Sequence, residues 1–533
     1  MDRDRLDQVI RNFFECDPRP IVQIIRELLA SLQAEQSLPP GILMSRNYET
    51  AQENPEIHTL PGNLKDARDA IFPYFWGTDG WASKLHLENV KGPANYASLI
   101  GAIACLLKNP NLCVDTYSQR SNELELKAIT ALANLIFYHT ESPWGVFTMG
   151  GTISNLYGGK IGIEKVAPGA MRQGLAGRPL AGIVSEAAHY SNATLAGWLG
   201  LGIDHLHAIP TDRNLSIRLD LLEARLEQLH ASGRAVAFVI ATFGSTDAFG
   251  IDDLAGIRHL LDDFSRRHGV PAPQLHVDAA VGWALCFLVE YDLESNPLKL
   301  TDEMRPCVAA AQRACQMFRF ADSVTLDFHK LGWGHYPSSA FIVNRRDDLR
   351  FLARQPSDMP YFSEADYRRD PALFTLECSR PAIGPYSVMA SLNGIGLIGY
   401  QMLVANAIEL ATKLKRRIEE LEFCKVLNPE TIGPSVCWWV LPRGRDAKAI
   451  FAALEAGTLD EELAHRTFGE VKRLFEKREA ILDPARDAKL SFTTSMGYRP
   501  GGHDLPAWKA VFFNPRTDDA VIDQIIRSIE DVA

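Results

Sequence analysis

A lysine directly after an apolar run is the first residue whose type and place could do chemistry. Lys330 follows the run SVTLDF and lies among aromatic side chains, with few acidic residues near it in the sequence. Partial loss of water would lower the pKa of its amine and make it a better nucleophile toward an aldehyde. The alternative interpretation is an exposed lysine at the start of a loop, because most lysines are exposed.

Two further titratable residues follow apolar runs in the same way. Asp278 ends the run QLHVD, and the two alanines after it leave room for a flat ring. A carboxylate there can hold a pyridine nitrogen in its protonated form, which makes the ring an electron sink. His189, in SEAAHYS, could stack on such a ring and assist a later protonation. Helix capping by Asp278 and a surface position for His189 are the alternatives.

Two polar turns complete the set. The segment MGGTISNLYGG, residues 149–159, places Gly151 and Thr152 between a predicted strand and a predicted helix. Glycines let the backbone approach a phosphate, and free N–H groups at a helix N-terminus attract an anion. In ATFGST, Thr246 and the serine before it could hydrogen-bond a ligand. Each turn could merely connect elements, but the five clusters together supply what an aldehyde cofactor with a phosphate needs.

The elements that would position these clusters alternate between residues 96 and 385. Short apolar runs such as AVAFVIAT are separated by amphipathic stretches such as LDLLEARLEQLHASG. Near-continuous apolar strands between helices predict a mostly parallel sheet covered on both faces, and therefore an α/β domain. Ligands of such domains bind at the carboxyl ends of the strands, where all five clusters lie. We therefore predict an N-terminal helical and irregular segment as a candidate dimer contact (1–95), a large ligand-binding domain (96–385) and a small α+β domain (386–533).

Composition narrows the classes of protein further. The 533 residues carry a net charge of −11 with no basic stripe, so no nucleic acid partner is expected. No run of eighteen apolar residues occurs, and the N-terminus MDRDRLDQVI lacks the order of a secretory signal. We therefore expect a cytoplasmic protein with no membrane partner. The nine cysteines form no CxxC pair, which favours reduced thiols and no metal site.

In their order along the chain, these motifs resemble those of the group II pyridoxal-phosphate-dependent decarboxylases, which include glutamate, diaminobutyrate, aromatic amino acid and tyrosine decarboxylases. The matching segments are GGTISNL (150–156), SEAAHYS (185–191), ATFGSTDAFGIDDL (241–254), HVDAA (276–280) and DFHK (327–330). The resemblance implies a fold type I, aspartate aminotransferase-like α/β enzyme with pyridoxal 5'-phosphate as its cofactor. It also implies a homodimer that converts an L-amino acid to the corresponding amine and CO2.

The resemblance assigns roles to residues in all five motifs. Lys330 would form the Schiff base with the cofactor aldehyde, and His189 would stack on the cofactor ring. The implied cofactor-binding residues are Asp278 at the pyridine nitrogen, Gly151, Thr152 and His329 near the phosphate, and Thr246 and Ala280 beside the ring.

Two assignments reach beyond the cofactor. Tyr361, in DMPYF, lies 31 residues after Lys330 and corresponds to the loop tyrosine that protonates the substrate carbon in the family. Arg380, in TLECSRP, is similar to an arginine that meets a substrate carboxylate, and an ordinary ion pair is its alternative role.

Departures from the family leave the substrate and the reaction open. Val281 follows HVDAA where the family usually has an aromatic residue, which changes a wall near the ring. Three alternatives to simple decarboxylation therefore remain. They are a carbon–carbon lyase or aldolase with the same cofactor, an oxygen-consuming decarboxylative deaminase, and a non-catalytic relative.

Overall fold

The computed structural model describes residues 4, 9–11, 13, 18–36, 60, 62–71, 74, 83–136, 144–359, 370–483 and 486–533. These residues form two compact units. The first comprises Met1–His86 with Ile481–Lys489, and the second comprises Leu87–Ala480 with Leu490–Ala533. In the first unit, helices α2 (Pro18–Gln36) and α3 (Leu64–Ile71) pack on each other. Every described residue of the predicted site belongs to the second unit.

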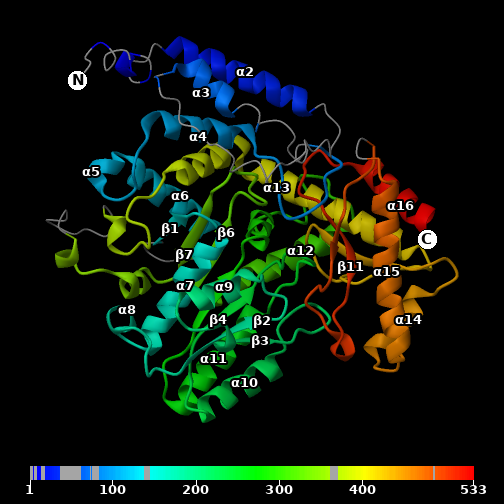
Figure 1. Ribbon diagram of the computed structural model, residues 1–533. Helices are drawn as coiled ribbons and strands as arrows, with labels where there is room; N and C mark the ends of the chain where they lie inside the picture. The colour runs from blue at the N-terminus through cyan, green and yellow to red at the C-terminus, as the bar shows by residue number, and fades with distance from the viewer. Residues whose placement is uncertain are drawn as a thin grey trace. The chain divides into compact units, whose positions relative to one another are not determined.

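The second unit is built around a seven-stranded sheet (Figure 1). The strand order is β1-β7-β6-β5-β4-β2-β3, and β3, β2, β4, β5 and β6 run parallel to one another. Strand β7 runs antiparallel between β1 and β6. The bounds are β1 Trp144–Thr148, β2 Leu180–Ser185, β3 Leu206–Ile209, β4 Ala235–Thr242, β5 Gln274–Asp278, β6 Ser323–Asp327 and β7 Ser339–Val343. This mostly parallel sheet confirms the predicted α/β class.

Helices follow the strands as the apolar periodicity predicted. Helix α11 begins at the N-cap Asp253, whose side chain accepts a hydrogen bond from Gly256 N, and ends at Gly269 in the left-handed conformation. Its buried residues recur at helical spacing and belong to the core cluster that also contains residues of β4 and β5. The helices of this part are α4 Tyr96–Lys108, α5 Asp115–Ser118, α6 Ser121–Leu135, α7 Gly151–Val166, α8 Ala170–Gln173, α9 Ser191–Trp198, α10 Leu219–Ala231, α11 Leu254–His268 and α12 Met304–Cys315.

Helix α7 packs unusually close to the sheet, because its glycines face the strands. A Cβ at Gly162 would lie 2.4 Å from the carbonyl oxygen of Ala237, and one at Gly158 would lie 2.4 Å from the His276 ring. Larger residues would therefore push the helix away from the sheet. This close packing holds the first turn of α7 directly beside the carboxyl ends of β5 and β6.

The C-terminal part begins with the long helix α13 (Ile383–Glu419), which is interrupted at Gly396 with φ +72°. By length and apolar composition α13 could cross a bilayer, but it packs along α4, α6 and α12 within the second unit. A four-stranded antiparallel sheet follows, in the order β10-β11-β9-β8. The elements are β8 Cys424–Val426, β9 Ser435–Val440, α14 Ala447–Glu455, α15 Glu461–Ile481, β10 Ser491–Thr493, β11 Ala507–Val511 and α16 Asp519–Val532.

Short 3-10 helices occupy several connections. They are η2 Ile203–His205, η3 Gly282–Leu288, η4 Gln316–Phe320, η5 Arg346–Leu352, η6 Pro356–Asp358, η7 Pro371–Leu373 and η8 Pro500–Gly502.

Candidate active site

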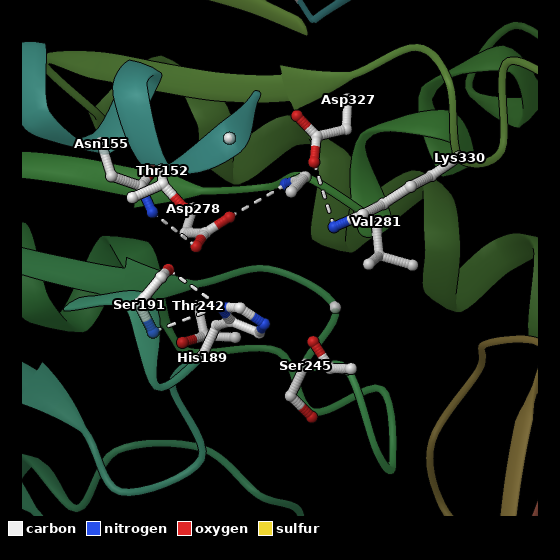
Figure 2. A pocket seen from close by; sticks show the side chains of 14 residues that line it. Thr152, Asn155, His189, Ser191, Thr242, Ser245, Asp278, Val281, Asp327 and Lys330 are labelled. Carbon is white, nitrogen blue, oxygen red and sulfur yellow. Dashed lines mark hydrogen bonds and ion pairs between the residues drawn. The ribbon is translucent and has the colours of Figure 1, made fainter. Parts of the chain in front are cut away.

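A pocket opens at the carboxyl ends of the parallel strands, where ligands of α/β domains bind (Figure 2). Residues from all five motifs line it. The predicted site residues among them are Gly151, Thr152, His189, Thr246, Asp278, Ala280 and Lys330. Seven further residues complete the lining: Asn155, Ser191, Thr242, Gly244, Ser245, Val281 and Asp327.

Lys330 is held by a carboxylate from its own motif. Its Nζ lies 3.0 Å from Oδ2 of Asp327, the last residue of β6, and Ser339 Oγ donates a hydrogen bond of 2.6 Å to the other oxygen, Oδ1. Burial alone would lower the pKa of the Lys330 amine, but the charges of Asp327 and Asp278 raise it above its ordinary value. The expectation of a lowered pKa is therefore wrong, because the charges of two carboxylates act on the amine.

Asp278 is fixed by donors on both carboxylate oxygens. Asn155 Nδ2 donates to Oδ2 at 2.7 Å, and the backbone N–H of Ala280 donates to Oδ1 at 3.2 Å. Asn155 lies one helical turn after Gly151 on α7, so its side chain reaches the end of β5. These two hydrogen bonds hold the carboxylate in one orientation at the end of β5.

His189 lies between the end of β2 and the start of α9. Its Nδ1 is 2.8 Å from Ser191 Oγ and accepts a longer bond of 3.3 Å from Ser191 N. Burial and the positive charge of Lys330 outweigh the nearby carboxylates and lower the pKa of the imidazole. At neutral pH the ring is therefore a neutral aromatic group, and Figure 2 shows it at the same pocket as Asp278 and Lys330.

The turn before α7 has the features of a phosphate cradle. Gly150 adopts φ +132°, a conformation that L side chains rarely reach, and it directly precedes the first turn of α7, whose free N–H groups can attract an anion. A Cβ at Gly151 would lie 3.0 Å from Asp327 Oδ2, so glycine keeps the space next to Lys330 open. Thr242 Oγ1, which is buried in the pocket wall, has no hydrogen-bond partner among the described residues. An amine, a fixed carboxylate, a helix N-terminus and an unused hydroxyl together fit pyridoxal phosphate.

His329 lies behind this wall rather than in the pocket lining. Its Nδ1 accepts a bond of 3.4 Å from Ser338 N, and its Nε2 is 3.7 Å from Asp327 Oδ2. Its ring contacts that of Tyr336 with centroids 3.8 Å apart and an interplanar angle of 38°. Burial lowers its pKa to about 4. In this structure His329 therefore supports Asp327, and its predicted phosphate contact stays a prediction.

Arg380 is engaged elsewhere. Its Nη1 and Nη2 bind the two carboxylate oxygens of Glu125 at 2.7 and 2.9 Å, and it also donates to the carbonyl oxygens of Phe147 and Leu112. Both side chains are 3% exposed, and Arg380 is not among the residues that line the pocket. This geometry supports the ion-pairing alternative for Arg380. Tyr361 lies outside the described residues.

Sequence reasoning did not single out Asp327 or Asn155 as site residues. Asp327 is part of the DFHK motif, and a signal was present in the strands themselves. In β5 and β6 every second residue is polar: Gln274, His276 and Asp278 in one strand, and Ser323, Thr325 and Asp327 in the other. Alternate residues of a strand share a face, so these polar side chains form a row that leads to the pocket.

Comparison with known proteins agrees with this geometry. Residues 40–441 match the family described as the pyridoxal-dependent decarboxylase conserved domain. Acidic amino acid decarboxylase GADL1 of Bos taurus is 24% identical over 443 residues, which cover 82% of this chain and 75% of the relative. Cysteine sulfinic acid decarboxylase of Rattus norvegicus is 27% identical over 414 residues, covering 76% and 73%. L-2,4-diaminobutyrate decarboxylase of Acinetobacter baumannii is 28% identical over 263 residues, 46% of each chain.

Solved structures share the fold. Mouse CSAD superposes with a TM-score of 0.75 at 20% identity and covers 97% of this chain and 99% of its own. Oryza sativa TDC with PLP and tryptamine gives 0.76 at 14% identity, covering 98% and 99%. The fold and the pocket define a fold type I pyridoxal phosphate enzyme. The chain belongs to the pyridoxal-dependent decarboxylase family, and it is an amino acid decarboxylase with pyridoxal phosphate as its cofactor.

Proposed function

We propose that Lys330, Asp278 and His189 carry out the decarboxylation of an L-amino acid in this pocket. The observation that supports these roles best is the meeting of one amine and one hydrogen-bonded carboxylate at the ends of adjacent parallel strands. Pyridoxal phosphate, when bound, supplies an aldehyde for amines and a protonated ring that accepts the electron pair left by the departing CO2.

The residues of the chain would position the cofactor and exclude water from the reacting carbon. Asp278, held by Asn155 and Ala280 N–H, would bind the ring nitrogen of the cofactor. Lys330 would supply the amine that attaches the cofactor, and the start of α7 with Gly151 and Thr152 would hold its phosphate. The His189 ring would lie against the cofactor ring and help to keep water from the reacting carbon. Tyr361 is the proposed donor of the proton to that carbon.

Covalent trapping tests the role of Lys330. Borohydride reduction of the holoenzyme followed by peptide mass mapping should place the cofactor on Lys330. The Lys330→Ala variant should lose the visible absorbance of the bound cofactor and nearly all turnover, because no other described amine lines the pocket. Cofactor trapped on a different lysine would contradict the assignment.

We also propose that the active form is a homodimer with the site beside the interface. Large apolar side chains are exposed on the two contacting helices α4 and α13, including Ile100, Leu107 and Ile398. Met149 and Tyr190, the sequence neighbours of the glycine turn and His189, are also exposed. Contiguous exposed apolar surface is typical of an association site. Light scattering should give twice the chain mass of 59.2 kDa, and a monomeric active enzyme would refute the proposal.

We also propose the cytoplasm as the compartment of the enzyme. Cell fractionation should find the enzyme and its activity in the soluble cytoplasmic fraction, and recovery with membranes or outside the cell would contradict this.

A further inference from the structure

A fully buried imidazole lies behind the site. His276 is 0% exposed and precedes Asp278 by two residues in β5, so both side chains leave the same face of the strand, toward α7. Gly158 of α7 makes room for the ring, and Asn155 lies three residues earlier on the same helix. Burying an imidazole is costly unless its nitrogens are hydrogen-bonded. The partners of these nitrogens therefore indicate why a histidine occupies this position.

Asn155 connects His276 to Asp278 through two hydrogen bonds. His276 Nε2 is 3.0 Å from Asn155 Oδ1, and Asn155 Nδ2 is 2.7 Å from Asp278 Oδ2. The anionic Asp278 oxygen only accepts, so the amide nitrogen of Asn155 must face it and the amide oxygen must face His276. His276 Nε2 must then carry a proton and donate it. The imidazole thus determines which way the Asn155 amide points.

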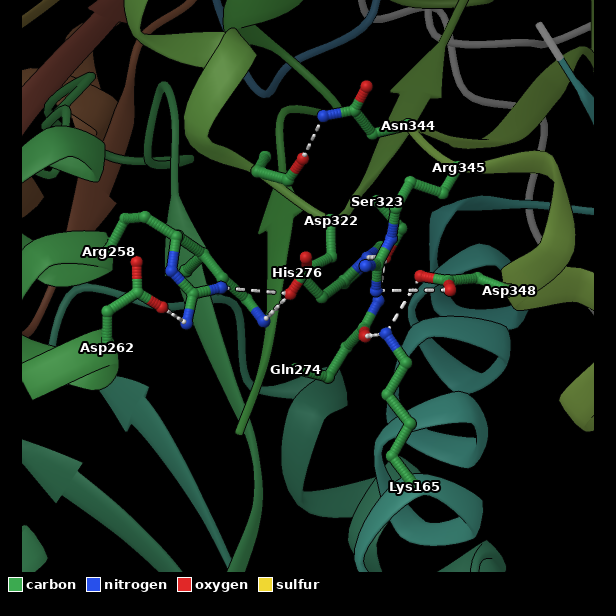
Figure 3. A network of polar contacts seen from close by, with 12 residues as sticks. Lys165, Arg258, Asp262, Gln274, His276, Asp322, Ser323, Asn344, Arg345 and Asp348 are labelled. Carbon is green, nitrogen blue, oxygen red and sulfur yellow. Dashed lines mark hydrogen bonds and ion pairs between the residues drawn. The ribbon is translucent and has the colours of Figure 1, made fainter. Parts of the chain in front are cut away.

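The outer partners make the opposite nitrogen an acceptor. His276 Nδ1 is 2.8 Å from Ser323 Oγ, which itself accepts a bond of 3.0 Å from Gln274 Nε2. Gln274 Oε1 accepts a bond of 2.6 Å from the Lys165 ammonium, which is paired with Asp348 at 2.8 Å (Figure 3). The Ser323 hydroxyl, already an acceptor from Gln274, donates its proton to His276 Nδ1.

All donors in this chain therefore point the same way. The order runs from Lys165 through Gln274, Ser323, His276 and Asn155, and it ends on Asp278. Gln274, His276 and Ser323 are each 0% exposed, so water does not compete for these bonds. Aligned hydrogen bonds in a buried, low-dielectric environment polarise one another. The last donor of the chain, Asn155 Nδ2, therefore has a fixed direction toward Asp278 Oδ2.

We infer that His276 is a positioning residue that fixes, through Asn155, the orientation of the carboxylate of Asp278. This inference rests on the proposed role of Asp278 at the ring nitrogen. Burial lowers the pKa of His276 to about 3, so the ring remains neutral and its role is to orient rather than to transfer a proton.

Four variants of the full chain separate positioning from packing. His276→Leu removes the donor to Asn155, and His276→Gln restores an amide donor near the place of Nε2. Ser323→Ala removes the hydroxyl behind the ring. Thr325→Val is the matched control, because its hydroxyl also lies 3.0 Å from His276 Nε2 but does not connect His276 to Asn155 or Asp278.

Two quantities report on Asp278 independently of turnover. The first is the dissociation constant of pyridoxal phosphate from the apoenzyme, followed by quenching of protein fluorescence. The second is the pH at which the visible absorbance of the bound cofactor changes. In metal sites, loss of a residue that hydrogen-bonds a metal ligand lowers metal affinity by about 10- to 100-fold. We expect His276→Leu to raise the dissociation constant of pyridoxal phosphate by a factor of that order. His276→Gln should recover part of the lost affinity. The dissociation constant of Thr325→Val should stay within about twofold of the wild-type value.

The outcomes distinguish the inference from the proposed function. A raised dissociation constant and a shifted absorbance titration for His276→Leu, with Thr325→Val unchanged, support it. Equal values for His276→Leu and wild type, or equal losses in both variants, overturn it. If His276→Leu does not fold, Ser323→Ala decides, and wild-type values for that variant overturn the inference. Wild-type protein that binds no pyridoxal phosphate would instead refute the proposed function.

Discussion

The ion pair between Lys330 and Asp327 predicts how the apoenzyme captures its cofactor. The two charged atoms lie 3.0 Å apart, and the side chains are only 15% and 4% exposed. At an effective dielectric constant of about 20, this distance corresponds to a Coulomb attraction of roughly 5 kcal/mol. Burial of both groups offsets much of that energy, and about 1.5–3 kcal/mol is a typical net value for such a charged hydrogen bond.

The Asp327→Asn variant removes this attraction and keeps an acceptor for Ser339. Because Asp327 raises the pKa of Lys330, the wild-type amine stays charged to higher pH and attacks an aldehyde slowly at neutral pH. Loss of about 1.5 kcal/mol, the lower value for this ion pair, increases the fraction of neutral Lys330 amine roughly tenfold. The variant should therefore bind pyridoxal phosphate about tenfold faster at neutral pH.

Stopped-flow absorbance after mixing apoenzyme with pyridoxal phosphate measures this rate across the pH range. In wild type the rate should rise with pH through the raised pKa of Lys330, and in Asp327→Asn the same rise should occur at lower pH. Asp322→Asn is the matched control, since Asp322 lies at the opposite end of β6 and pairs with Arg258. Identical pH profiles for wild type and Asp327→Asn would refute the electrostatic reasoning.

Three further predictions concern other parts of the account. Tyr361→Phe should lower kcat for amine formation by about 100-fold or more, as expected for loss of a general acid, while Tyr336→Phe should not; normal turnover in Tyr361→Phe would remove this residue from the mechanism. Glu125→Gln should cost about 3 kcal/mol or more in urea unfolding, because Arg380 would keep a buried charge without its partner, and KM should stay unchanged; a raised KM with unchanged stability would favour a substrate role for Arg380. Pyridoxal phosphate at 100 times its Kd should stabilise the apoenzyme by about 2.7 kcal/mol, and an unshifted thermal transition would argue against binding to the folded state.

Local sequence patterns were sufficient to predict the site residues that lie at the ends of strands. Lys330, Asp278, His189 and the glycine turn each follow an apolar run, and parallel strands bring their carboxyl ends to one edge of the sheet. The positions of these residues in the pocket could therefore be predicted without any knowledge of their long-range contacts.

Properties that depend on partners distant in the sequence could not be predicted in this way. Arg380 matched a motif, but its ion pair with Glu125 joins residues 255 positions apart. The raised pKa of Lys330 depends on the direction of the Asp327 side chain, which the sequence does not specify. The buried polar row in β5 and β6 was visible as an alternation within apolar strands, and reading those strands as uniformly apolar concealed it.

The most direct test of the central claim is CO2 release by the purified holoenzyme from a panel of amino acids, with amine formation and oxygen uptake recorded in parallel. The panel should include acidic, aromatic and diamino acids. The account predicts CO2 with a stoichiometric amount of amine and no oxygen uptake for at least one of them. Bound cofactor without CO2 release from any amino acid would contradict the account and favour carbon–carbon lyase or aldolase chemistry, and oxygen uptake with an aldehyde product would instead indicate oxidative deamination.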